Sequence, residues 1–331
     1  MPGTVLITGI TGFAGSHLAE RFVSRGDEVH GIAHEDPPFP HLATVADRVQ
    51  VHRGNILDVA SVRDAIATAR PDAVVHLAAQ AVPTLAALDP VAAVRVNVLG
   101  TATLLAALDA HPEIRLVMAS SADVYGAPDT ELVDESAPLR PANVYAATKV
   151  ASEALVREFG GRRTAATTVL RPANQNGPRQ HPGLAASAFA KQIAEAEGGT
   201  AEAVVKHGVL EARRDFVDVR DMADAYARAT DLTAAGVAVY NVGSGIAVSV
   251  GEILETLIAL ARVPVRAELD PERVRSGTPA AFALDASRFR DRTGWAPRTS
   301  LRTSLLDTLE YWRSQVRAEA GVGAPGRGAT V

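Results

Sequence analysis

A glycine-rich turn near the N-terminus limits the folds open to this chain more than any other feature. The run VLITGITGFAGSHLAE places Gly9, Gly12 and Gly15 between a β-rich segment at 4–8 and a helical segment at 14–26. Glycines at such a turn let the backbone bend tightly and approach a pyrophosphate, which then lies against the helix N-terminus. Because the spacing follows a strand and opens a helix, it predicts a dinucleotide-binding turn rather than a purely structural one.

Strands and helices continue to alternate through the first half of the chain. Near-continuous apolar strands separated by helices are typical of a parallel sheet covered on both faces. Right-handed crossovers then give a Rossmann-like, doubly wound α/β fold. The expected strands are 4–8, 28–33, 48–54, 72–79, 114–121 and 164–173, and the expected helices are 14–26, 58–69, one inside 90–110 and one from 144 to 160.

The alternation breaks after Pro172, where NQNGPRQHPG is rich in turn formers. Later segments are typical of a smaller mixed α/β region that binds the substrate. We therefore expect an NAD(P)-binding Rossmann domain, a C-terminal substrate-binding region and a Gly-rich disordered tail. Their predicted bounds are 1–173 with parts of 212–242 for the first, 174–211 and 243–320 for the second, and 321–331 for the tail.

Composition excludes several classes of protein. The 331 residues carry a formal net charge of -5, which gives no reason to expect nucleic-acid binding. The absence of cysteine removes disulfides and thiol nucleophiles, and the nine histidines lack metal-site spacing, so no metal is expected. The N-terminus does not resemble a signal peptide. The most apolar run is interrupted by Arg95 and Asn97, so no uncharged run reaches membrane-spanning length. We expect a cytoplasmic protein without a membrane span.

The end of the second predicted strand bears on the choice of nicotinamide cofactor. A carboxylate there binds the ribose 2′-hydroxyl of NAD. The sequence GIAHED places Ala33 and then His34 at this point, without the acid and without an arginine to hold a 2′-phosphate. This favours NADP, although NAD stays open because Glu35 or Asp36 can still reach the ribose.

A tyrosine and a lysine lie four residues apart in the helical stretch VYAATKVASEAL. Tyr145 and Lys149 share one helix face, and Lys149 is one of only three lysines in the chain. A neighbouring ammonium favours the phenolate, so we expect a lowered pKa for Tyr145 and a role in proton transfer. Ser121 follows the fifth strand, at the sheet edge where such folds bind ligands. These three residues make a coherent hydride-transfer site.

At these residues the chain resembles the extended short-chain dehydrogenase/reductase family. The motifs TGITGFAG, HLAAQ, SSADVYG, YAATK, RPANQNGP and RRDFVDVRD match in order. The finer match, in GPRQHPGLAASAFAKQIAEAEGG and TGWAPRTSLRTSLLDTLEYWR, is closest to the GDP-sugar branch of reductases and GDP-mannose 4,6-dehydratases. The resemblance implies a nucleotide-sugar-modifying oxidoreductase.

The resemblance also implies roles for individual residues. Ser121, Tyr145 and Lys149 fall on the catalytic trio. Substrate contacts are implied for Ser121, Asn174, Arg214 and Arg275, the two arginines binding the diphosphate, whereas Arg213 and Arg273 read as solvated surface. Cofactor contacts are implied for Gly9, Gly12, Phe13, Ala14, Gly15, His34, Ile56, Asp58, Leu77, Ala78, Ala79, Gln80, Tyr145, Lys149 and Arg171.

Four functions remain open: dehydratase, reductase, 4-epimerase and non-catalytic regulator. A 4,6-dehydratase needs a further acid/base, usually a glutamate, where this chain has the shorter Asp123. A reductase or 4-epimerase needs only the trio, and the expected NADPH favours reduction of a GDP-4-keto-6-deoxy-hexose. A non-catalytic cofactor-binding regulator typically loses the Tyr or the Lys, and both are present. Ala173 replaces a common aromatic, so the sugar and the base stay open.

The resemblance implies a homodimer as well. In the family, the helix inside 90–110 and the helix 144–160 pair with the same helices of a second subunit. In this chain both helices have faces of small residues, with alanines at positions 92, 93, 102, 106 and 107 and at 146, 147, 151 and 154.

Overall fold

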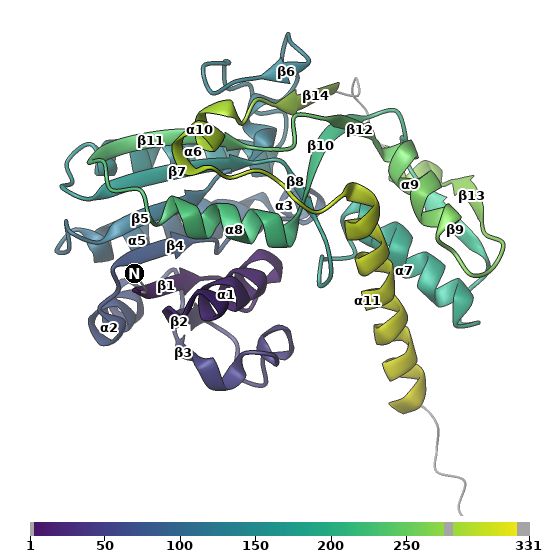
Figure 1. The fold of residues 1–331 in the computed structure, drawn as a ribbon, viewed down its shortest axis with the longest axis horizontal. Coiled ribbons are helices and arrows are strands. Elements are labelled where there is room, and N and C mark those ends of the chain that lie inside the picture. Colours follow the sequence, from purple (N-terminus) through teal and green to yellow (C-terminus); the bar gives the residue numbers. More distant parts are fainter. Residues whose placement is uncertain (1–2, 275–280, 323–331) are drawn as a thin grey trace, which may run out of the picture. The chain divides into compact units, whose positions relative to one another are not determined.

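The computed structural model describes residues 3–274 and 281–322 (Figure 1). The chain divides into two units, each with its own internal contacts. The first consists of Met1–Gln175, Arg214–Ala247 and Ala280–Thr299, and the second of Asn176–Arg213, Val248–Pro279 and Ser300–Val331.

A seven-stranded sheet forms the centre of the first unit (Figure 1). Every neighbouring pair in it is parallel. The strand order β11-β7-β5-β4-β1-β2-β3 grows outward in both directions from β1 and β4, which creates a switch point at their carboxyl ends. The strands are β1 (Thr4–Thr8), β2 (Glu28–Ala33), β3 (Val49–Arg53), β4 (Ala73–His76), β5 (Arg115–Ala119), β7 (Ala166–Pro172) and β11 (Gly236–Val242).

Helices cover both faces of this sheet, which confirms the predicted Rossmann-like fold. Side chains alternate across each strand, so Val5 and Ile7 of β1 enter one apolar cluster and Leu6 enters the other. One face carries α1 (Phe13–Arg25) and α8 (Val219–Ala229), and the other carries α2 (Val59–Ala69), α5 (Gly100–Leu108) and α6 (Val144–Gly160).

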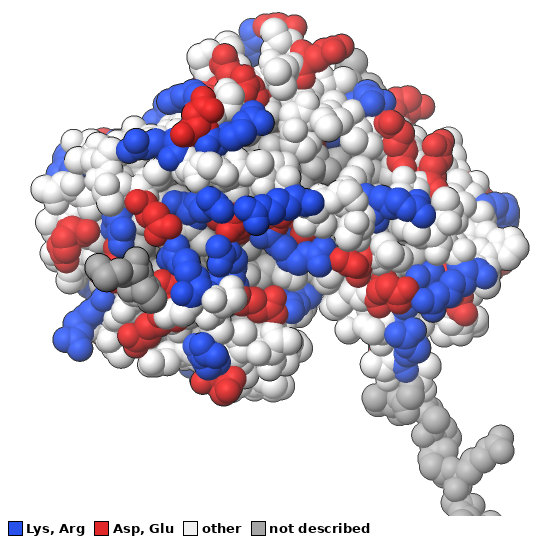
Figure 2. Space-filling model, viewed as in Figure 1, with Lys and Arg blue, Asp and Glu red and all other residues white. Residues whose placement is uncertain are grey.

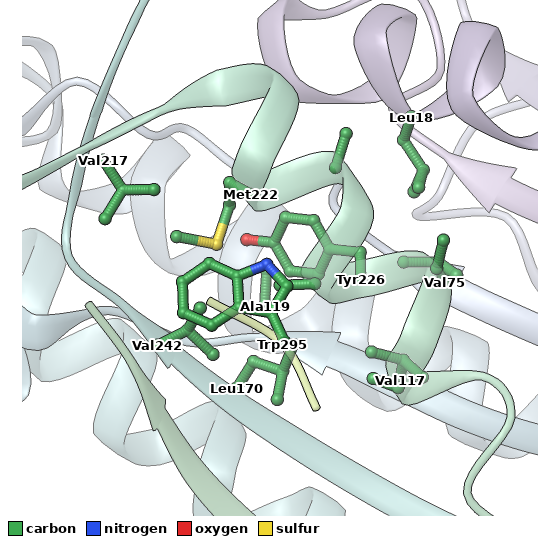
Figure 3. Packing of buried hydrophobic residues seen from close by; sticks show 14 of the residues in the cluster. Leu18, Val75, Val117, Ala119, Leu170, Val217, Met222, Tyr226, Val242 and Trp295 are labelled. Carbon is green, nitrogen blue, oxygen red and sulfur yellow. The ribbon is translucent and has the colours of Figure 1, made fainter. Parts of the chain in front are cut away.

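The apolar cluster under α1 and α8 includes large, fully buried aromatic side chains such as Trp295 and Tyr226 (Figure 3). Tyr226 and Met222 of α8 pack with Trp295, whose indole Nε1 donates to the carbonyl of Asp221 at 2.9 Å. Trp295 follows β14 (Ala281–Leu284) and α10 (Ser287–Thr293). The prediction placed this segment in the C-terminal region, but the buried tryptophan ties it to the first unit.

Several short elements complete the first unit. A small sheet contains β10 (Arg213–Asp218), β14 and β6 (Leu132–Val133). The other short elements are η1 (Pro40–Leu42), η2 (Ala46–Arg48), α3 (Pro83–Leu88), α4 (Pro90–Val94), the π-helical turn η3 (Arg95–Leu99) and the 3₁₀ turn η4 (Ala122–Tyr125).

The second unit is helical with one short strand pair. Its helices are α7 (Ala185–Glu197), α9 (Val250–Ala259) and α11 (Leu301–Val322), and β9 (Val204–His207) pairs in parallel with β13 (Arg266–Leu269), which η5 (Pro271–Arg273) follows. Strands β8 (Asn174–Asn176) and β12 (Ala247–Ser249) lie where the chain passes from one unit to the other.

Positive and negative side chains are interspersed on the face shown in Figure 2. This is the pattern of an ordinary solvated surface. One helical stretch, Pro90–Leu108, is long and apolar enough to cross a membrane by length and composition, but half of its window is buried within the structure. Buried core helices of globular proteins pass the same test.

Candidate active site

The glycine turn forms a cradle between β1 and α1 that leaves no room for side chains. Gly9 has φ +73°, and a Cβ there would come within 2.9 Å of the Ala78 backbone. A Cβ on Gly15 would come within 2.1 Å of the Gly9 carbonyl oxygen. The turn is closed by the Gly12 N–H, which donates to the Gly9 carbonyl at 3.1 Å.

The N-terminus of α1 opens into this cradle. Gly12 caps the helix without a side-chain hydrogen bond, and the first turn, all of it described, carries no acidic side chain. The first N–H groups of the helix are therefore available to an anion, with Phe13 and Ala14 at its start. The residues present fit the pyrophosphate of a dinucleotide.

The loop after β4 runs beside the glycine turn. Leu77 and Ala78 donate their N–H groups to the carbonyl and the hydroxyl of Thr8, both at 3.2 Å. The Gln80 N–H donates to Asn97 Oδ1 at 2.7 Å. The structure thus brings the predicted residues Leu77, Ala78, Ala79 and Gln80 together at the switch point.

Two other predicted cofactor residues lie near α2. Asp58 is the N-cap of α2, and its Oδ1 accepts from the Ala60 N–H at 3.0 Å. Ile56 packs against the cluster under α2 and α5, close to Gly100. Asp58 therefore has a helix-capping role that its motif did not reveal.

The three residues of the predicted trio come together from β5 and α6. Ser121 follows β5 and caps η4, where its Oγ accepts from the Asp123 N–H at 3.1 Å. Its side chain is also hydrogen-bonded to that of Tyr145 on α6. Lys149, one helical turn further along, places Nζ 2.9 Å from the Ala119 carbonyl oxygen and 5.8 Å from the Tyr145 ring centroid.

The pKa of Tyr145 is raised, not lowered as the sequence led us to expect. Burial is the main cause, and the charge of Asp123 adds to it, whereas the hydrogen bond with Ser121 opposes it. Burial also lowers the pKa of Lys149, to about 8, against the opposing charge of Glu153. Tyr145 is therefore a neutral phenol, the form that donates a proton.

Asp123 and Arg214 are partly buried charged groups beside the trio. Burial raises the pKa of Asp123, and the positive charge of Arg214 opposes this. The Arg214 guanidinium lies 5.2 Å from the Phe282 ring centroid, and burial lowers its pKa. Arg213, in contrast, forms an exposed 2.9 Å ion pair with Glu252.

Three further residues were predicted to bind substrate or cofactor, and the two that the structure describes, Asn174 and Arg171, form hydrogen bonds with residues outside the trio and the glycine turn. The Asn174 amide donates to the Asp215 carbonyl at 3.2 Å. Arg171 is 1% exposed and inside the protein, so the structure does not place it as a cofactor contact. Its guanidinium binds both oxygens of Glu153, at 2.9 and 2.8 Å, and the Tyr125 hydroxyl at 2.8 Å. Arg275 lies outside the described residues.

Glu153 is a buried group that the motif search missed. It lies one turn beyond Lys149, and its carboxylate also accepts from Ser120 Oγ at 2.5 Å and from Arg157 at 3.2 Å. It links the strand end that precedes Ser121 to the helix that carries Lys149. The available signal was an acid four residues after the lysine, on the same helix face.

The motif search also missed a buried chain of hydrogen bonds under the loop that follows β4. His76 contacts the hydroxyls of Thr8 at 2.8 Å and Thr101 at 3.0 Å, and burial lowers its pKa to about 3. Asn97, on the π-helical turn, binds Thr148 of α6 at 2.8 Å. A lone Asn inside an apolar helix was the signal for this group.

The fold and this site define a nicotinamide-dependent enzyme of the extended short-chain dehydrogenase/reductase class. A sequence profile described as GDP-mannose 4,6 dehydratase matches residues 6–308. The chain therefore belongs to this family of nucleotide-sugar-modifying enzymes.

Individual relatives span more than one reaction. The GDP-6-deoxy-D-mannose reductase of Pseudomonas aeruginosa is 33% identical over 96% of this chain and 100% of its own length. The solved structure of RMD from P. aeruginosa complexed with NADPH has a TM-score of 0.79 at 31% identity, covering 94% of this chain and 99% of that one. The UDP-glucose 4-epimerase of Thermus thermophilus with NAD has a TM-score of 0.81 at 30% identity, covering 93% and 98%.

Proposed function

We propose that this chain reduces the C4 ketone of a GDP-4-keto-6-deoxy-hexose, using a reduced nicotinamide cofactor and the site formed by Ser121, Tyr145 and Lys149. One observation carries the proposal: the Tyr145 phenol is buried, hydrogen-bonded to Ser121 and kept protonated by its raised pKa. A protonated phenol is what a ketone oxygen needs as it becomes an alcohol. The 33% identity with a GDP-6-deoxy-D-mannose reductase supports this choice.

Each residue of the trio has a separate task in this reaction. The bound nicotinamide supplies hydride chemistry at C4. Tyr145 gives its phenolic proton to the C4 oxygen, so that one hydride and one proton turn the ketone into a secondary alcohol. Ser121 holds the same oxygen through its hydroxyl. Lys149, cationic below its pKa of about 8, stabilises the phenolate that Tyr145 becomes.

Arg214 and Asn174 are the proposed contacts to the nucleotide diphosphate. A planar guanidinium matches phosphate oxygens in pairs. Arg214 is already partly desolvated beside Asp123, so a diphosphate would meet a cation that is poorly hydrated and strongly attractive. Guanine is the base that the family match favours.

A second candidate reaction is favoured by Asp123. A partly buried carboxyl group with a raised pKa beside Tyr145 can act as a general acid or base. This is the additional group that a 4,6-dehydratase requires, and such an enzyme, like a 4-epimerase, retains its cofactor and recycles the hydride internally.

We also propose a homodimer with a cytoplasmic location. Apolar side chains between α3 and η3 are exposed, with Leu88 at 81% and Val91 at 70%. These elements lie against α6, whose Ala147 and Ala154 are exposed as well. A stripe of exposed apolar and small residues on two neighbouring helices suits helix pairing with a second copy.

The first experiment identifies the cofactor that copurifies with the protein. The purified protein is denatured and the released nucleotide is identified by mass. An empty site that takes up added reduced cofactor supports the reductase. Near-stoichiometric NAD⁺ or NADP⁺ supports the dehydratase or epimerase and overturns the reductase.

The second experiment is turnover with GDP-4-keto-6-deoxy-mannose, followed by the loss of reduced-nicotinamide absorbance. We expect Tyr145→Phe to lower kcat by about 10² to 10⁴, because general acid catalysis contributes that much. As a control, the variant should bind the cofactor as the wild type does. Unchanged turnover in Tyr145→Phe would contradict the proposed role of the trio.

A further inference from the structure

A carboxylate lies beside the glycine turn, although β2 ends without the acidic residue that this fold usually has there. Strand β2 ends at Ala33, and Glu35 lies two residues beyond. The Thr11 hydroxyl, between Gly9 and Gly12 in the turn, donates to Glu35 Oε1. This hydrogen bond holds the Glu35 carboxylate beside the dinucleotide cradle.

Glu35 is ionised at neutral pH. Burial acts to raise its pKa, but the Thr11 hydrogen bond, backbone amides and the neighbouring His34 outweigh burial and lower the pKa below its ordinary value. His34 Nδ1 lies 2.9 Å from the other carboxylate oxygen, Oε2. The ionised Glu35 carboxylate therefore places a negative charge beside the glycine turn.

An arginine that could bind a 2′-phosphate is already paired with an acidic residue. Arg53 of β3 is the register partner of Ala33, so it lies next to the end of β2. Its guanidinium forms a 2.8 Å ion pair with Asp36, and both side chains are exposed. A phosphate placed here would meet the charge of Glu35 and would have to displace Asp36 from Arg53.

We infer that Glu35, positioned by Thr11, binds the adenosine ribose hydroxyls and makes this site select NAD(H) over NADP(H). A carboxylate accepts hydrogen bonds from free ribose hydroxyls and repels a 2′-phosphate. Glu35 follows Gly15 by 20 residues, the distance at which this fold places its ribose acid. The inference rests on the nicotinamide site of the proposed function, and it reverses the preference for NADP that Ala33 suggested.

The test measures cofactor binding without any sugar substrate. Protein freed of copurified nucleotide is titrated with NADH and with NADPH by calorimetry. For the wild type we expect NADH to bind at least about tenfold more tightly than NADPH. For Glu35→Gln we expect this ratio to fall to near one, because NADH loses a charged acceptor with two oxygens and NADPH loses its repulsion.

Two further variants separate the specific effect from a general change of charge. Asp47→Asn removes one exposed negative charge from η2 and should leave the ratio unchanged. Thr11→Val keeps the Glu35 charge but removes its anchor, and we expect a partial loss of the preference. A wild type that prefers NADPH, or a Glu35→Gln protein with an unaltered ratio, overturns the inference.

The result is distinguishable from failure of the reductase proposal. Selective NADH binding without turnover of the keto sugar would keep the inference and remove the reductase. If the wild type bound neither cofactor, the inference would fail together with the nicotinamide site.

Discussion

Within the trio, Lys149 is the residue whose charge changes near neutral pH. Burial lowers its pKa to about 8, and only the charge of Glu153 acts in the other direction. The ammonium form is thus present below pH 8 and is lost as the pH rises through that value. Tyr145 stays protonated over this range because its own pKa is raised.

We therefore expect kcat/KM to fall above about pH 8, with a limb that belongs to Lys149. The measurement is a pH–rate profile of the wild type and of Lys149→Arg between pH 6 and 10. The arginine keeps its charge throughout, so its residual activity should lack this limb. A limb at the same pH in both proteins would assign it to another group.

At the scale of elements, one buried ion pair joins α6, the helix that carries Tyr145 and Lys149, to strand β7. Glu153 of α6 and Arg171 of β7 are each 1% exposed and bind in a bidentate fashion. Burial acts to raise the pKa of Glu153, but Arg171, Ser120 and Arg157 outweigh it and lower the pKa below 4.5. Its stabilising effect is therefore present at neutral pH and is lost as the pH falls through the lowered pKa.

We expect Glu153→Gln to lower the free energy of unfolding by about 3–5 kcal/mol at pH 7, because it leaves a buried guanidinium without its counter-charge. Urea unfolding at pH 7 and pH 4 measures this, and the difference between variant and wild type should shrink at pH 4. Arg157→Ala removes a half-exposed partner of the same carboxylate and should cost less than about 1 kcal/mol. Equal losses in both variants would contradict this account.

At the scale of the whole molecule, the proposed homodimer depends on the exposed apolar side chains between α3 and η3. We expect Leu88→Glu combined with Val91→Glu to yield a monomer, because a dimer would bury two unpaired charges on each chain. Size-exclusion chromatography with light scattering measures the mass. Leu132→Glu, at a side chain 54% exposed on β6, is the matched control and should not change it. A monomeric wild type would exclude the dimer.

The fold was predictable because its signals are local. Neighbouring residues reveal the glycines of the first turn, the apolar strands and the alternating helices. From these signals we predicted a parallel sheet, and the structure has one of seven strands. The trio was predictable for the same reason, since Tyr145 and Lys149 are one helical turn apart and Ser121 follows a strand.

The features that the sequence did not predict depend on tertiary contacts. Arg171 lies in a motif that favours a cofactor contact, but its partner Glu153 comes from another element 18 residues away. Thr11 and Glu35 are 24 residues apart, and only folding brings them into a hydrogen bond. The raised pKa of Tyr145 likewise depends on how deeply the side chain is buried.

The buried imidazole of His76 has a consequence for spectroscopy. Both ring nitrogens face hydroxyl groups, and a pKa of about 3 keeps the ring neutral across the pH range of ordinary buffers. Its nitrogen resonances should therefore stay constant with pH. Thr8 also receives the Ala78 N–H of the loop beside the cradle, so a ligand that moves this loop would be seen at His76. The histidine is a built-in NMR reporter of site occupancy that needs no label on the ligand.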